Sequence, residues 1–138
     1  MRVLDLPAIP EEVAHALDFI SNSLEEFGVS DKKTVQAAML ATEESLVKLL
    51  ENVISGQEME IGVKKSFLGA VIVSLEVPGR AFNFYKDMGW HDSDELTDAD
   101  SPDIENALRG TILTSIDGDV VYDNKKGINI VHIVIKKD

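Results

Sequence analysis

Cysteine is absent from this chain of 138 residues. Without thiols the protein forms no disulfide, binds no zinc through thiolates and has no cysteine nucleophile. Positive charge is scarce as well, because 13 lysines and arginines stand against 25 acidic residues and give a net charge of −12. Nucleic acids and anionic membranes are bound by surfaces rich in Lys and Arg. The composition therefore argues against both as partners.

Long apolar runs are also missing. No segment approaches the roughly 20 consecutive apolar residues that span a bilayer. The first residues lack the charged start and apolar centre of a signal peptide. The hydrophobic share of 44% is typical of a globular protein. We therefore expect a single folded domain over residues 1–138, in the cytoplasm.

Helical spacing dominates the first part of the chain. After a short apolar stretch at 2–6, typical of a strand, Pro10 and two acidic residues favour the start of a helix. Apolar residues then recur every three or four positions up to Gly28, a typical helix stop. A second helix is predicted from a cap at Ser30 or Asp31 to about residue 55.

Alternating apolar residues replace this spacing further along the chain. They predict strands over 59–63 and 67–77, and "PDIENALRGTILTSI" at 102–116 predicts a third helix. The C-terminal stretch predicts a hairpin that turns at 124–127 and ends in an interior strand. This order indicates an α+β two-layer sandwich, with a mostly antiparallel mixed sheet and helices on one face.

Residues 78–102 show no periodicity. From His91 to Glu105, seven of fifteen positions are acidic, which predicts a mobile acidic loop. A calcium loop is the alternative, but the spacing lacks its central glycine and terminal glutamate. The three histidines are scattered without zinc-ligand spacing. No metal site is predicted.

Two segments carry a resemblance to a known family. They are "LPAIPEEV" at 6–13 and "SIDGDVVYDNKKGINIVHIVIKK" at 115–137. With the order of elements, they resemble the ATPase fold of gyrase, heat-shock chaperones, histidine kinases and mismatch-repair ATPases. Within that group the chain is most similar to the anti-sigma-factor serine kinases, and the resemblance covers nearly the whole chain.

The resemblance assigns roles to a stripe on the second helix, where Glu44, Lys48 and Asn52 follow one another at steps of four. In the family a Glu at the first position takes a proton from the attacking hydroxyl, so Glu44 is the catalytic candidate. The family has a Mg²⁺-binding Asn where this chain has Lys48, and often His where it has Asn52. A lysine ammonium has no acceptor and cannot ligate Mg²⁺, although it can bind a phosphate. A surface ion pair between Glu44 and Lys48 is the structural alternative.

Two further family motifs bind the nucleotide, and both are altered here. In "VPGRAF", Val77 stands where the family has an adenine-binding Asp, Gly79 is kept and Arg80 follows it. In "LRGT", Gly110 is kept and Arg109 precedes it. A strand that ends in a Pro-Gly turn explains the first segment equally well. The cofactor-binding candidates are Lys48, Asn52, Val77, Gly79, Arg80, Arg109 and Gly110.

These substitutions lead to three functional hypotheses. The first is a regulatory protein that binds ATP weakly, without Mg²⁺ at the family position, and acts on a protein partner. By analogy the partner is a sigma factor or a small antagonist, and the protein is a homodimer. The second is an active serine kinase with an unusual pocket, and the third is an accessory domain of a longer protein. Tyr85 and Trp90 either anchor a partner or fill the altered pocket.

Overall fold

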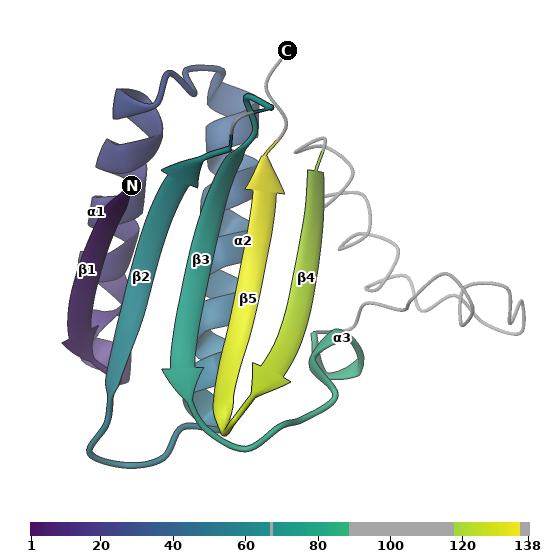
Figure 1. Cartoon of the computed structure of the whole chain (residues 1–138). Coiled ribbons are helices and arrows are strands. Elements are labelled where there is room, and N and C mark those ends of the chain that lie inside the picture. The colour runs from purple at the N-terminus through teal and green to yellow at the C-terminus, as the bar shows by residue number, and fades with distance from the viewer. Residues whose placement is uncertain (67, 89–117, 136–138) are drawn as a thin grey trace, which may run out of the picture.

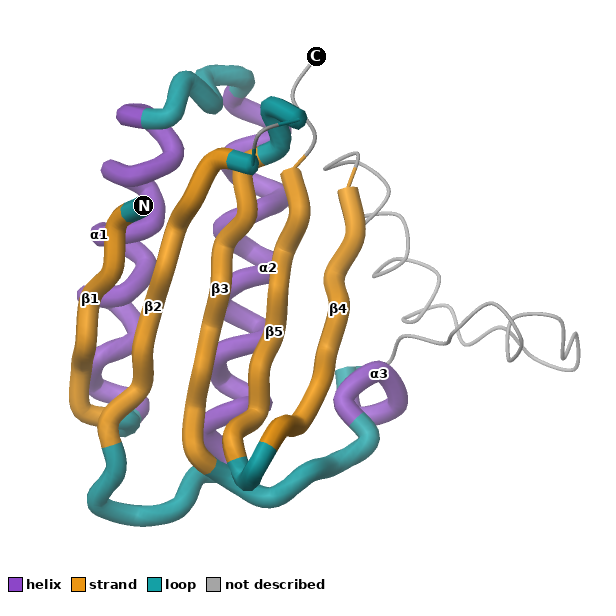
Figure 2. The backbone as a smooth tube through the Cα atoms, in the orientation of Figure 1, coloured by secondary structure: helices purple, strands orange, loops and turns teal. Residues whose placement is uncertain are grey.

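A computed structural model describes residues 1–66, 68–88 and 118–135 (Figures 1 and 2). Within these ranges five strands form one sheet, and α1 and α2 cover one of its faces. The elements are β1 (Arg2–Pro7), a 3-10 turn (Pro10–Glu12), α1 (Val13–Glu26), α2 (Lys32–Glu51), β2 (Glu58–Lys65), β3 (Val71–Pro78), α3 (Phe84–Asp87), β4 (Gly118–Lys125) and β5 (Ile128–Ile135). The two-layer α+β sandwich is confirmed.

The strand order in the sheet is β1-β2-β3-β5-β4, and every pairing is antiparallel. The last strand lies between β3 and β4, so its predicted interior position is confirmed. Its hairpin turn consists of Lys126 and Gly127, with φ values of 54° and 80°. Positive φ at both turn residues matches the right-handed twist of the strands. The turn is therefore shorter than the predicted 124–127.

Local chemistry explains where α2 begins and ends. The Asp31 carboxylate accepts hydrogen bonds from the Thr34 N–H at 3.0 Å and the Thr34 hydroxyl at 2.7 Å. These bonds lower the pKa of Asp31 and cap the helix. At the other end Asn52 is the C-cap, so α2 stops at Glu51, earlier than predicted. None of the helices in the described ranges is long and apolar enough to cross a membrane.

The strand predicted from residue 67 begins only at Val71. The chain turns tightly just before it, where Gly69 N–H donates to Ser66 O at 3.0 Å and Gly69 has a φ of 91°. Leu68 is 82% exposed in this turn. The predicted strand was too long at its start because the residues before Val71 are mostly apolar, although Gly69 allows a tight turn there.

The core lies between the sheet and the two helices, which Figure 1 shows together behind the strands. Inward side chains of β2, β3 and β5 meet α1 and α2 there, and small residues of α2, among them Ala38 and Ala41, bring that helix close to the sheet. In the described structure no helix covers the opposite face of the sheet. The predicted acidic loop and the predicted helix at 102–116 lie outside the described residues.

Candidate functional site

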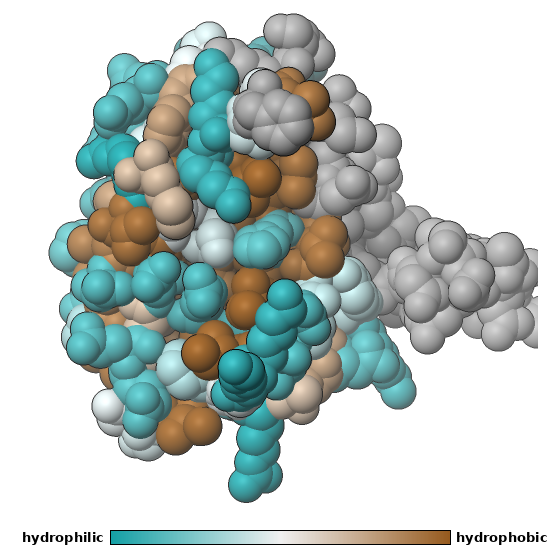
Figure 3. Space-filling model, in the orientation of Figure 1, coloured by the Kyte–Doolittle hydropathy of each residue, from teal (hydrophilic) through white to brown (hydrophobic). Residues whose placement is uncertain are grey.

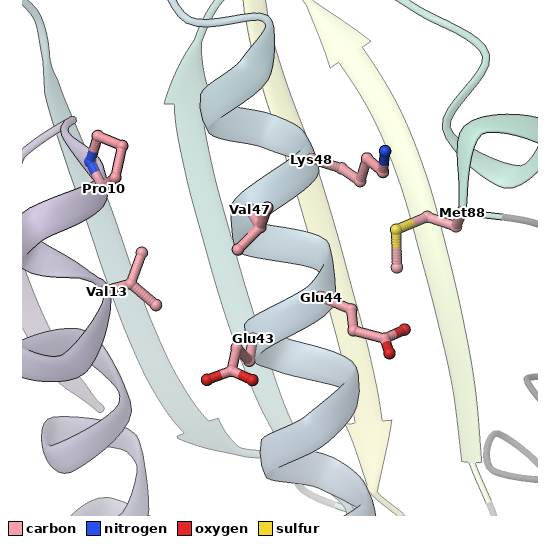
Figure 4. A pocket seen from close by; sticks show the side chains of 7 residues that line it. All are labelled: Pro10, Val13, Glu43, Glu44, Val47, Lys48 and Met88. Carbon is pink, nitrogen blue, oxygen red and sulfur yellow. The ribbon is translucent and has the colours of Figure 1, made fainter.

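A cavity of about 370 Å³ lies on the side of α2 that faces away from the sheet (Figure 4). Four residues of α2 form one wall, the start of α1 with the preceding turn forms a second, and the end of α3 contributes the last residue. The lining residues are Pro10, Val13, Glu43, Glu44, Val47, Lys48 and Met88. Most of the lining is apolar, and two carboxylates and one ammonium supply its charge.

Glu44 and Lys48 therefore share one cavity, as their spacing of one helical turn requires. The Lys48 Nζ lies 3.2 Å from Glu51 Oε2, and their side chains are 33% and 54% exposed. Among the described residues, the ion partner of Lys48 is Glu51, not the predicted alternative Glu44. Glu44 is half-buried and faces the same space as the Lys48 stem (Figure 4).

Asn52, the third residue of the stripe, has a structural role at the end of α2. Its side-chain amide donates to the Lys48 carbonyl at 3.1 Å, and its own carbonyl accepts from the Arg80 N–H at 3.3 Å. It does not line the cavity. Asn is a common residue at helix C-termini, and that signal was present in the sequence.

Gly79 packs directly against this helix end. A Cβ atom at position 79 would lie 2.3 Å from the Asn52 carbonyl oxygen and 3.0 Å from Asn129 Nδ2. The Gly79 N–H also donates to Gly127 O at 3.0 Å. Glycine is required here because two backbone segments meet, whether or not a ligand approaches.

A buried polar network holds the segment that follows Gly79. Asn129 is fully buried, and its amide donates to Arg80 O at 2.9 Å. The Tyr122 hydroxyl bonds to Asn129 Oδ1 and accepts from the Phe82 N–H at 3.1 Å. Asn124 Nδ2 also donates to Asn129 Oδ1 at 2.9 Å. The sequence analysis missed this network, although Asn129 is the only amide in β5, a strand whose other residues are apolar apart from His132.

Val77 is 0% exposed and points toward the helices from β3. Its neighbour Glu76 points to the opposite face of the sheet, as strand alternation predicts. No acidic side chain therefore points toward the helices at this position, to which the resemblance assigns adenine binding. A ligand cannot contact Val77 in this conformation, because core residues cover it.

Aromatic residues after β3 fill the space beside β4. The rings of Phe84 and Tyr122 stack with centroids 5.2 Å apart, and Phe84 is fully buried. The Tyr85 hydroxyl accepts from the Tyr122 N–H at 2.9 Å, so α3 covers part of the β4 edge. Tyr85 does not line the cavity on α2, so neither predicted role for it is tested, and Trp90 lies outside the described residues.

The remaining predicted residues do not join these groups. Arg80 is exposed, with its backbone held by Asn52 and Asn129. Arg109 and Gly110 lie outside the described residues. In the described ranges no three His, Asp or Glu side chains come together as a metal site. The structure thus brings Glu44 and Lys48 together at one place, and Asn52, Gly79 and Arg80 at another.

No protein-family model matches this chain, and no curated protein matches it. Several solved structures are similar to this chain, among them three structures of histidine kinases. The histidine kinase domain of the Erythrobacter litoralis EL346 blue-light activated histidine kinase matches with a TM-score of 0.51 and 14% identity, over 94% of this chain and 61% of that chain. A second structure of the EL346 kinase matches with a TM-score of 0.55 and 15% identity, over 96% of this chain and 42% of that chain. The Acinetobacter baumannii histidine kinase AdeS matches with a TM-score of 0.52 and 14% identity, over 99% of this chain and 68% of that chain.

This chain spans less than two thirds of each EL346 structure. At these identities the similarity shows the fold alone. The coarse part of the resemblance, the fold, is confirmed: this chain has a fold similar to that of these histidine kinase structures.

Proposed function

We propose that this protein is a regulatory domain that uses the ATPase fold to bind a protein partner, with weak and Mg²⁺-independent ATP binding. The burial of Val77 carries the proposal, because adenine recognition needs an acceptor at this position and the chain has a fully buried alkyl side chain. The Val77 side chain is part of the hydrophobic core and can neither donate nor accept a hydrogen bond.

Lys48 supports the same proposal. Its ammonium lies at the family's metal-ligand position and pairs with Glu51 at 3.2 Å. A cation there repels Mg²⁺ instead of ligating it. Any nucleotide phosphate would meet this single point charge beside two carboxylates, Glu43 and Glu44, which repel it.

The partner is the least constrained part of the proposal. By analogy with the anti-sigma-factor serine kinases, we infer a sigma factor or a small antagonist protein, a homodimeric state and a cytoplasmic location. The net charge of −12 favours a basic protein over a nucleic acid. The apolar lining of the cavity, with Val47 45% exposed, is consistent with a protein contact on this side of α2.

An active serine kinase is the second candidate. One observation favours it: Glu44 and Lys48 line the same cavity, where a carboxylate can accept a proton and an ammonium can hold a phosphate. The third hypothesis, an accessory domain of a longer protein, agrees with the share of the EL346 kinase that this chain spans.

Calorimetric titration with ATP, with and without Mg²⁺, tests the proposal. We expect weak binding that Mg²⁺ does not strengthen in the wild type. The variant Lys48→Asn restores the family's metal ligand and is the matched comparison. Tight, Mg²⁺-dependent binding by the wild type, or phosphotransfer to a serine-bearing protein that Glu44→Gln abolishes, would establish the kinase instead.

A further inference from the structure

The face of the sheet opposite α1 and α2 is partly apolar. Antiparallel sheets that face water usually carry polar residues on that side. Here Ile72 and Val134 lie directly opposite each other on β3 and β5, and Val121 on β4 is 48% exposed. Ile128 and Ile130 extend the apolar side chains along β5. Figure 3, drawn from this side, shows apolar residues gathered near the middle of the face.

Carboxylates form a row beside these apolar residues. The strand register places Asp5 of β1 opposite Glu60 of β2, and Glu60 opposite Glu76 of β3. All three point away from the helices, and Asp123 continues the row on β4. Like charges directly opposite each other destabilise a sheet. Partial burial, followed by repulsion from Glu76 and Asp5, raises the pKa of Glu60.

Among the residues that the structure describes, positive groups on this face do not balance that row. Lys64 lies on β2 opposite Ile72, and Lys125 lies at the far end of β4. His132 sits between them, and burial, then the Lys64 charge, lowers its pKa. The uncharged form of His132 is therefore favoured near neutral pH. The face has a negative balance, so a second copy of this chain would meet like charge.

We propose that this open sheet face binds a basic segment of a partner protein, whose apolar side chains contact Ile72, Val134 and Val121 while its Lys or Arg residues pair with Asp5, Glu60 and Glu76. Apolar burial supplies the attraction, and the cations remove the repulsion within the carboxylate row. The inference rests on the proposed partner-binding role and assigns it a surface. It does not depend on the nucleotide, because none of these residues lines the cavity on α2.

The test measures binding of a synthetic amphipathic peptide of Leu and Lys, with a counterpart in which Glu replaces every Lys. The charge variant is Glu60→Gln with Glu76→Gln. The control variant is Asp18→Asn with Glu25→Gln, which changes the net charge equally at exposed positions of α1. Two exposed charge pairs together correspond to about a tenfold loss of affinity. We expect that loss in the charge variant only, and no binding of the Glu peptide.

The apolar part of the face is tested by Ile72→Thr with Val134→Thr, which keeps β-branched residues in the strands. This variant should also bind the Leu and Lys peptide more weakly while its thermal unfolding remains cooperative. Equal losses in the charge and control variants, or no binding by the wild type, would overturn the proposal. Self-association of the wild type that the charge variant changes would identify a second copy as the occupant and overturn it as well.

These outcomes are separate from those of the proposed function. Tight, Mg²⁺-dependent ATP binding refutes the regulatory proposal without affecting the peptide results. Conversely, failure of the peptide to distinguish the two double variants removes this surface and leaves the nucleotide argument intact.

Discussion

Replacing Gly79 with alanine tests whether this glycine is required by close packing or by the approach of a ligand. Gly79 is not one of the described glycines with a positive φ, so its backbone conformation accepts alanine. The obstacle is space, because the new Cβ would lie 2.3 Å from the Asn52 carbonyl oxygen. Ordinary contacts of a Cβ begin at about 3.4 Å, so the end of α2 and the turn after β3 must separate by about 1 Å.

That separation also strains the hydrogen bonds from Arg80 N–H to Asn52 O and from Asn129 Nδ2 to Arg80 O. Overpacking of this kind costs about 1–3 kcal/mol, and weakened buried hydrogen bonds place Gly79→Ala at about 2–3 kcal/mol. For a domain of this size, each kcal/mol lowers the melting temperature by about 3–4 °C. The expected decrease is therefore about 6–12 °C without any ligand.

Gly62→Ala is the matched control. A Cβ at position 62 meets Met1 Cε at 3.5 Å, an ordinary contact, so its stability should change by less than about 0.5 kcal/mol. Thermal unfolding followed by circular dichroism compares the two variants. If Gly79→Ala melts within about 2 °C of the wild type, the close packing is not what requires glycine, and a ligand-related role regains support.

Three further substitutions test the charges and polar groups. Lys48→Asn should cost less than about 1 kcal/mol, the sum of an exposed ion pair and a weaker helix former, whereas a loss near 3 kcal/mol in urea unfolding would show that Lys48 compensates a buried carboxylate. Ser45→Ala should raise the free energy of unfolding by about 1 kcal/mol, because Ser45 Oγ is buried and has no partner among the described residues. Ser23→Ala, whose hydroxyl donates to Phe19 O at 2.7 Å, should give no such gain. Glu60→Gln should stabilise the protein at neutral pH by a few tenths of a kcal/mol. The pKa of Glu60 is raised in the folded state, so the glutamate costs stability as the pH rises through that pKa. The gain should therefore vanish once the pH falls below the ordinary pKa of a glutamate, and a gain independent of pH would contradict this assignment.

The architecture followed from patterns that the sequence displays directly. Helical spacing and the cap at Asp31 predicted α1 and α2, and alternation predicted the strands, because both periodicities reflect which side faces the core. The predicted boundaries were wrong where a glycine with positive φ turns the chain, as at Gly69 before β3 and Gly127 in the hairpin. Composition does not show whether a glycine continues a strand or turns it.

The candidate site was less predictable for a different reason. Spacing on one helix correctly brought Glu44 and Lys48 into one cavity. Among the described residues Lys48 pairs with its i,i+3 neighbour Glu51. Spacing alone does not choose between the i,i+3 and i,i+4 neighbours, because side-chain direction decides between them. The contacts of Asn129 depend on chain segments nearly 50 residues apart, and a single sequence does not show such pairing.

The candidate site residues fall into two groups that the structure holds in different ways. Val77, Gly79 and Asn52 are fixed by packing: one fills the core and the other two join α2 to the turn after β3. Glu44 and Lys48 lie at a surface cavity, where substitution costs little stability. An aspartate at position 77 would therefore cost far more stability than an asparagine at position 48, because it would be buried in an apolar core. Under the proposed function, position 77 therefore bears on weak ATP binding more than position 48 does.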